Sequence, residues 1–135
     1  MIPKCIKQKQ LGEQVDKMST YSTEEQVIGK WIDGRNLYRK VVVYSNTDII
    51  GANSKTVNID IPHNILNFKQ AINVSAVDSL GGYILPSLAS SEGNIANSST
   101  SIHTVDTSNI KLRIINNTWG PRTWYITLEY TKTTD

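Results

Sequence analysis

Residues 124–131 read Trp124-Tyr125-Ile126-Thr127-Leu128-Glu129-Tyr130-Thr131, and this stretch decides the fold. Large apolar side chains stand at every second position from Trp124 to Tyr130, while Tyr125, Thr127, Glu129 and Thr131 stand between them. Successive side chains of a β-strand point to opposite faces of the sheet. The alternation therefore predicts a strand with one face buried in the core and one face turned away from it.

The same period of two recurs upstream: Val57, Ile59 and Ile61 alternate with Thr56, Asn58 and Asp60, and Ile72, Val74 and Ala76 alternate with Asn73, Ser75 and Val77. Residues 26–44 predict a β-hairpin, because the alternating stretch from Val27 to Ile32 is followed by Asp33-Gly34, a common two-residue hairpin signal, and then by a second apolar run. Shorter strands are predicted at residues 83–85, 102–105 and 111–115. The tally is seven or eight strands.

These short strands are separated by polar turns and show no interleaved helical period, which is typical of an antiparallel sheet fold. The sequence predicts one all-β domain over residues 21–135, an antiparallel β-sandwich with a jelly-roll-like arrangement. One short helical turn is expected at residues 63–68, directly after Pro62. The predicted core comprises Val27, Trp31, Val57, Ile59, Val74, Leu112, Ile114, Ile126 and Leu128.

Residues 1–20 form a separate N-terminal arm that serves attachment or oligomerisation. Leu11, Val15 and Met18 have the spacing that begins a coiled-coil seam, but a single heptad also fits a flexible arm, and both interpretations stay open. Cys5 is the one cysteine of the chain, so no intrachain disulfide can form. A lone cysteine indicates synthesis in a reducing cytoplasm.

Charge and hydropathy exclude several classes of partner. Fourteen basic and twelve acidic residues are scattered along the chain and give a formal net charge of +2, whereas nucleic-acid binding usually needs a concentrated basic face. No stretch approaches the roughly eighteen apolar residues of a membrane helix, and the N-terminus lacks the apolar segment of a signal peptide. We expect neither a nucleic-acid partner nor membrane insertion.

No catalytic or metal-binding constellation is found in the sequence. His63 and His103 are far apart, and neither has a further nitrogen, sulfur or carboxylate at metal-site spacing. The chain has no nucleophile elbow, phosphate loop or dinucleotide fingerprint, and its acids show no paired motif. We therefore expect no enzyme activity, no catalytic residue, no metal and no cofactor.

A binding site is predicted in the loop at residues 116–122, which holds Gly120-Pro121. Sugars are bound by an aromatic face together with hydrogen-bonding side chains. The residues proposed for this role are Asn116, Asn117, Trp119 and Arg122, with Tyr83 as a second aromatic candidate. The competing interpretation is that Trp119 packs onto the edge of the sandwich or at a subunit interface.

Two stretches carry a resemblance to a known family: residues 21–40, YSTEEQVIGKWIDGRNLYRK, and residues 124–135, WYITLEYTKTTD. They resemble a small domain at the C-termini of phage and prophage tail-fibre, baseplate and other virion proteins of Firmicutes and related gut bacteria. The match brackets residues 21–135, although the residues between the two stretches are too divergent to align. The resemblance implies a β-sandwich head of a trimeric fibre, located where a virion meets its host.

The resemblance implies a homotrimer in the virion, made in the host cytoplasm and joined to other virion proteins through the arm. Our first hypothesis is a fibre-head or receptor-binding module that adheres to a host-surface glycan or protein. The alternative is a structural subunit, such as a head-fibre, decoration or baseplate protein, without a host ligand of its own. This domain follows a twenty-residue arm, whereas longer family members end in it, which favours a free-standing subunit. A depolymerase is disfavoured because no acidic motif is present.

Overall fold

The computed structural model describes residues 20–80, 84–85, 87–88 and 99–135, and all regular structure in these residues is β-strand. The predictions made for the arm and for Cys5 fall on residues 1–19, outside this part of the chain. The described strands are β1 (Gln26–Lys30), β2 (Asn36–Asn46), β3 (Ile50–Pro62), β4 (Phe68–Asp78), β5 (Ile84–Leu85), β6 (Ser87–Leu88), β7 (Ser99–Val105), β8 (Asn109–Trp119) and β9 (Arg122–Lys132).

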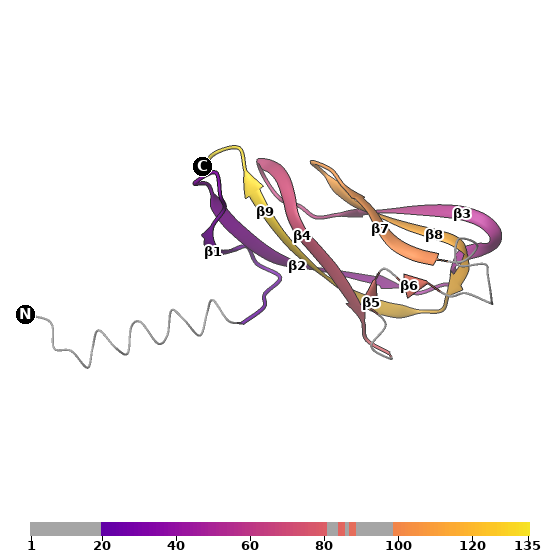
Figure 1. Ribbon diagram of the computed structural model, residues 1–135. Helices are drawn as coiled ribbons and strands as arrows, with labels where there is room; N and C mark the ends of the chain where they lie inside the picture. Colours follow the sequence, from indigo (N-terminus) through magenta and orange to yellow (C-terminus); the bar gives the residue numbers. More distant parts are fainter. Residues whose placement is uncertain (1–19, 81–83, 86, 89–98) are drawn as a thin grey trace, which may run out of the picture.

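The strands form two antiparallel sheets. Sheet A has the order β1-β2-β9-β4-β5, and sheet B has the order β3-β8-β7-β6. The chain passes between the sheets at the β2–β3, β3–β4, β5–β6 and β8–β9 connections. In Figure 1 the strands of the two sheets run at an angle to one another. The predicted all-β antiparallel fold is confirmed. The jelly-roll arrangement is not confirmed by this strand order.

The core lies between the sheets and is built mainly by β8 and β9. Ile110, Leu112 and Ile114 of β8 are almost fully buried. In β9 the entire predicted face is buried at 1% exposure or less, which comprises Trp124, Ile126, Leu128 and Tyr130. The buried face predicted by the alternation from Trp124 to Tyr130 is therefore confirmed, because β9 lies in the middle of sheet A between β2 and β4 and beneath sheet B.

The predicted core is correct in its centre and wrong at its edge. Val57, Ile59, Val74 and Trp31 are only partly buried. Val27 is 50% exposed. For Val27 the reason is position: β1 is an edge strand at the end of sheet A that sheet B does not cover (Figure 1), so alternation in β1 does not lead to burial. Ile59 and Val74 still pack against the core from β3 and β4.

The predicted hairpin at residues 26–44 is confirmed by the antiparallel pairing of β1 with β2. Its turn is closed by two backbone hydrogen bonds, from the Gly34 amide to the Trp31 carbonyl and from the Trp31 amide to the Arg35 carbonyl, both 2.9 Å. Gly34 has a φ of 87°, a conformation that glycine adopts without steric cost. Asp33 accepts a hydrogen bond from the Arg35 amide and so stabilises the same turn.

The helical turn expected at residues 63–68 is wrong. These residues connect β3 to β4 without helix, because Asn64 and Asn67 adopt φ angles of 56° and 59°, which interrupt a right-handed turn. Asparagine tolerates this conformation better than most residues. Ile65 and Phe68 still point into the core, whereas Leu66 is 78% exposed.

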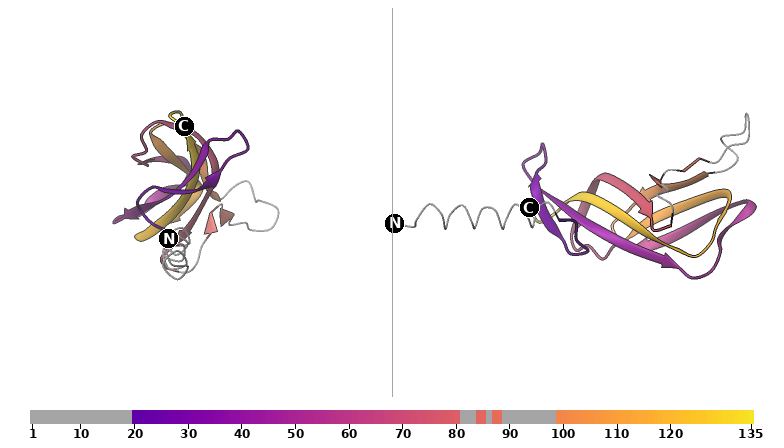
Figure 2. Two further views of the ribbon diagram at one scale, coloured as in Figure 1. Left: turned by 90° about the vertical axis from the view of Figure 1, so that its left-hand side faces the viewer. Right: turned by 90° about the horizontal axis from the view of Figure 1, so that it is seen from below.

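The described N-terminal residues from Thr20 onward and the C-terminus lie at one end of the domain, and the β8–β9 turn lies at the other (Figures 1 and 2). The segment before β1 is fixed to the sheet by a backbone hydrogen bond of 2.8 Å from Val41 to Ser22. Glu25 accepts hydrogen bonds from the Tyr130 hydroxyl and from the Lys132 ammonium group, at 2.5 and 2.6 Å. Residues 20–25 thus belong to the folded domain.

In the described part of the chain, β3 has a strand partner on one side only, which makes it the long edge of sheet B. It spans 13 residues and pairs with β8 on both sides of a register shift between Ala52 and Thr56. Within this irregularity Ser54 has a φ of 60° and its amide donates to the side-chain oxygen of Asn116 at 2.6 Å.

Candidate functional site

The site predicted at residues 116–122 is mostly strand. Asn116 to Trp119 form the end of β8, Arg122 begins β9, and only Gly120-Pro121 make the turn between them. The turn lies at the end of the domain away from the chain termini (Figure 1). Loops at the free end of a sandwich are common places for recognition, so the predicted region does lie where such a site is expected.

Trp119 faces the core in this structure. It is 7% exposed, and its ring meets the Trp124 ring edge to face, with centroids 5.4 Å apart and an interplanar angle of 89°. Its indole nitrogen donates to the Thr100 hydroxyl, which is also buried. The expectation of an exposed indole face is therefore corrected, because both the ring and its nitrogen are used inside the domain.

The polar side chains of this region also bond to the domain itself. The Arg122 guanidinium lies 2.8 Å from the Asp78 carboxylate, and its central carbon is 4.4 Å from the centroid of the Trp119 ring. Asn116 has a φ of 46°, and its side-chain oxygen accepts the Ser54 amide. The side chain of Asn117 and the whole of Tyr83 lie outside the described residues, so their predicted roles stay predictions.

A different surface has the composition that the predicted site was meant to have. On the outer side of sheet A, Val43, Tyr125 and Val77 stand directly opposite one another on β2, β9 and β4. Their exposures are 46%, 40% and 42%. Residues directly opposite on antiparallel strands contact one another, so the three side chains form one continuous apolar row.

Residues with hydroxyl groups border this apolar row on both sides. The next cross-strand row on one side contains Thr127 and Ser75 together with Val41, and on the other side Ser45 pairs with Thr123. The Ser45 and Thr123 hydroxyls are 2.9 Å apart and share a hydrogen bond. We call these residues the outer face: Val41, Val43, Ser45, Ser75, Val77, Thr123, Tyr125 and Thr127.

The run Val41-Val42-Val43 explains why β2 is apolar on both sides. Val42 points into the core, which places Val41 and Val43 on the outer face. An uninterrupted apolar run in a strand is the signal of a strand whose two faces are both covered. That run, together with the large Tyr125 between Thr123 and Thr127 on the outer side of β9, is the sequence signal that would have located this surface.

Residues 21–23 lie beside part of the outer face and form a groove of about 450 Å³ with it. The groove is lined by Tyr21, Ser22, Thr23, Val41, Val43, Val77, Tyr125 and Thr127. The Arg39 guanidinium lies 3.9 Å from the centroid of the Tyr21 ring and thereby helps to hold this segment against the sheet. None of the eight lining residues is Asp, Glu, Lys, Arg or His.

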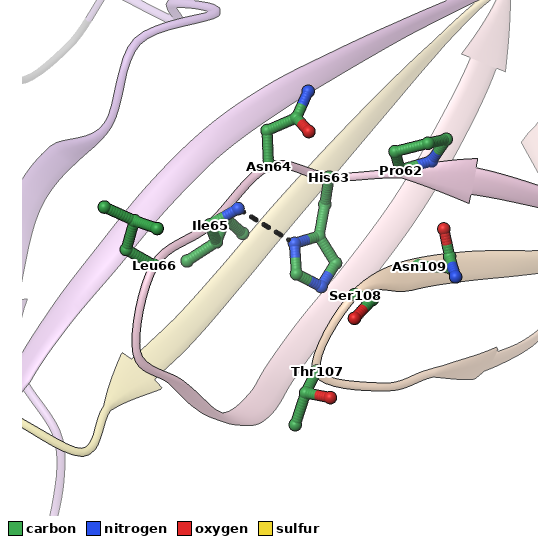
Figure 3. Close-up of a pocket in the computed structure, with 8 residues that line it drawn as sticks. All are labelled: Pro62, His63, Asn64, Ile65, Leu66, Thr107, Ser108 and Asn109. Carbon is green, nitrogen blue, oxygen red and sulfur yellow. Dashed lines mark hydrogen bonds between the residues drawn. The ribbon is translucent and has the colours of Figure 1, made fainter.

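A second hollow, of about 370 Å³, lies where the β3–β4 connection meets the β7–β8 turn (Figure 3). His63 is buried beside it, with Nδ1 accepting the Ile65 amide at 3.1 Å and Nε2 donating to the Asp106 carbonyl at 2.8 Å. This is the neutral imidazole with both nitrogens engaged, so His63 joins two turns and offers no nitrogen for chemistry.

Asp106 stabilises the β7–β8 turn beside this hollow. Its carboxylate accepts the backbone amides of Asn109 and Ser108 at 2.7 and 2.8 Å. These two hydrogen bonds, that of Asn109 first, hold the pKa of Asp106 below its ordinary value of 3.8. The carboxylate is exposed, and its role is that of a turn residue.

At the end of the domain that holds the termini, four aromatic and charged side chains pack together. The rings of Tyr38 and Tyr130 stack with centroids 5.7 Å apart. Burial, followed by the hydrogen bond to Glu25, raises the pKa of Tyr130 well above its ordinary value of 10.0. A side-chain hydrogen bond to Asp135, followed by burial, raises the pKa of Tyr38. Neutral phenols are therefore favoured in the folded state.

Two further findings concern the described residues alone. Within them, no three side chains of His, Cys, Asp or Glu gather closely enough to hold a metal ion. Nor does this part of the chain contain a helix with the length and apolar character needed to cross a membrane. His103 is exposed on β7.

Comparison with family models, with curated proteins and with solved structures finds no significant match to this chain.

Proposed function

We propose that this protein is a binding module of a bacteriophage particle and that it adheres to the host surface through the outer face of sheet A. The proposal joins two lines of support. The stretches at residues 21–40 and 124–135 resemble virion domains that end tail fibres and baseplate proteins. The same two stretches supply Tyr21 and Tyr125, which both line the outer groove.

The observation that carries the proposal is the uncharged, half-exposed row of Val43, Tyr125 and Val77. Charged residues make up 19% of the chain, yet none stands among the eight residues of the outer face. Isolated exposed apolar residues are ordinary, but a contiguous apolar row framed by polar residues is typical of a surface that contacts another molecule.

The test measures adsorption of the fluorescently labelled protein to a panel of gut Firmicutes. We expect binding to a subset of strains and its loss in Tyr125→Ala. Leu66→Ala is the matched control, because Leu66 is also an exposed apolar residue but does not line the outer groove. Equal adsorption by Tyr125→Ala and the wild type, at equal melting temperature, contradicts the proposed surface.

A structural virion subunit is the second candidate function. The observation that favours it is the fixed position of residues 20–25, which sets the point where the arm joins the domain at the same end as the C-terminus. An attachment segment at one end leaves the rest of the domain pointing away from the particle. This candidate predicts the protein in purified virions, together with no adsorption of the isolated domain to any strain.

A further inference from the structure

We infer that the outer groove binds a neutral saccharide and that Tyr125 is the residue on which a sugar ring stacks. The inference rests on the proposed function and names the chemical class of its ligand. It concerns the groove lined by Tyr21, Ser22, Thr23 and Thr127 together with the apolar row of Val43, Tyr125 and Val77.

The absence of charge among the lining residues decides between classes of saccharide. A sialic acid, a uronic acid or a sulfated sugar would bring a carboxylate or sulfate into a groove whose lining residues include no cation. Removing such an anion from water without a partner is unfavourable. Arg39, which contacts Tyr21, is itself largely buried, with its guanidinium placed against the tyrosine ring. The groove therefore fits a ligand without ionised groups.

The lining residues combine an aromatic face with hydroxyl groups. Tyr125 stands between two valines of the same row, and its ring is 40% exposed. The C–H faces of a pyranose pack on such a ring, and its hydroxyls exchange hydrogen bonds with hydroxyls that both donate and accept. Ser22, Thr23 and Thr127 supply those groups around the ring. The groove volume of about 450 Å³ lies within the range that small-ligand sites occupy.

The size of the apolar row argues for a small ligand and against a protein partner on this face. Two valines and one tyrosine at these exposures offer on the order of 200 Å² of apolar surface, whereas a specific protein–protein interface covers about 800 Å² on each partner. A second copy of this chain would have to bury a much larger area of hydroxyl-bearing strand. One or two sugar rings match the row as it stands.

The experiment applies the purified full chain to immobilised neutral oligosaccharides containing glucose, galactose, rhamnose or N-acetylglucosamine, beside sialylated, uronic and sulfated ones. We expect binding to at least one neutral sugar and to no charged one. Tyr125→Ala should weaken this binding about tenfold or more, and Tyr125→Phe should retain it because the ring stays. Leu66→Ala should bind as the wild type does. Thermal melting of each variant separates a lost contact from a lost fold.

Cell-based measurements separate this inference from the proposed function. Periodate treatment of the bacteria destroys sugars with vicinal diols, while protease treatment removes surface proteins. Loss of adsorption after periodate alone supports the inference. Adsorption that survives periodate and is lost after protease overturns it and leaves the adhesive function standing. Preference for charged sugars, no binding to any neutral sugar, or full binding by Tyr125→Ala each overturns it as well.

Discussion

The β8–β9 corner and the outer face of sheet A contain the same kinds of residues and use them in opposite ways. At the corner, Trp119 and Arg122 direct an indole and a guanidinium toward Trp124 and Asp78 of the same chain. On the outer face, the Tyr125 ring and the Thr127 hydroxyl line a groove that is open to solvent. An aromatic residue beside polar side chains is thus a stabilising unit in one region and a candidate binding surface in the other.

The difference follows from the layer that covers each region. Trp119 ends a strand of sheet B whose inner side is packed on β9, so its side chain is enclosed by both sheets. Tyr125 lies on the outer side of sheet A, where no other strand of the described chain packs. Substitutions at the corner should therefore change stability, and substitutions on the outer face should change binding.

The largest expected effect is that of Trp119→Ala. Truncating a buried tryptophan should lower the free energy of unfolding by about 3–5 kcal/mol, because it opens a cavity and removes the hydrogen bond from the indole to the Thr100 hydroxyl. Tyr125→Ala should change it by about 1 kcal/mol or less, since the ring is half-exposed. Urea denaturation of both variants measures the contrast. Equal losses of stability would break the comparison.

Arg122→Ala should have the next largest effect. The Asp78 side chain is 0% exposed and that of Arg122 is 13% exposed, so removing the arginine leaves a buried carboxylate without its ion-pair partner. Such a change costs on the order of 3 kcal/mol. Asp78→Asn in the same chain should restore part of the stability, and a double-mutant cycle gives the coupling. Additive losses would show that the pair does not act as a unit.

Tyr130→Phe sharpens the comparison with a smaller effect at the opposite end of the domain. The pKa of Tyr130 is raised in the folded state, so its contribution to stability is present below pH 10 and is lost as the pH rises above the ordinary tyrosine value. Below that pH, losing the hydrogen bond to Glu25 should cost about 1 kcal/mol. The variant should also show a weaker decline in melting temperature than the wild type between about pH 9 and about pH 11, a range that brackets the ordinary tyrosine pKa of about 10. An unchanged alkaline profile would assign the decline to other groups, Tyr38 first.

The sequence predicted burial best for a strand that has one face in the core and the other face outside it. The alternation from Trp124 to Tyr130 predicted the buried face of β9 because that strand is central in its sheet. The hairpin at Asp33-Gly34 was predictable because its turn depends on local chemistry. Val27 was placed wrongly because alternation says which side a residue faces and not whether another layer covers that side.

The candidate site was harder to predict for the same physical reason. Trp119 stands beside Gly120-Pro121, a turn signal that suggests exposure, but its burial depends on Trp124 and Thr100 in three dimensions. The outer row depends on the register that aligns Val43, Tyr125 and Val77 across three strands. No single stretch of the chain contains that register, although the run of three valines in β2 indicates that its outer side is unusual.

The irregularity at Ser54 bears on how copies of this protein behave when they are crowded together. A long, regular edge strand is a template onto which another chain adds its own strand, and this is a common route to aggregation. In β3 the register shift and the left-handed Ser54 interrupt the edge, and the Ser54 amide is already bound by Asn116. The interruption therefore shortens the stretch of regular edge that β3 presents to a strand of another copy.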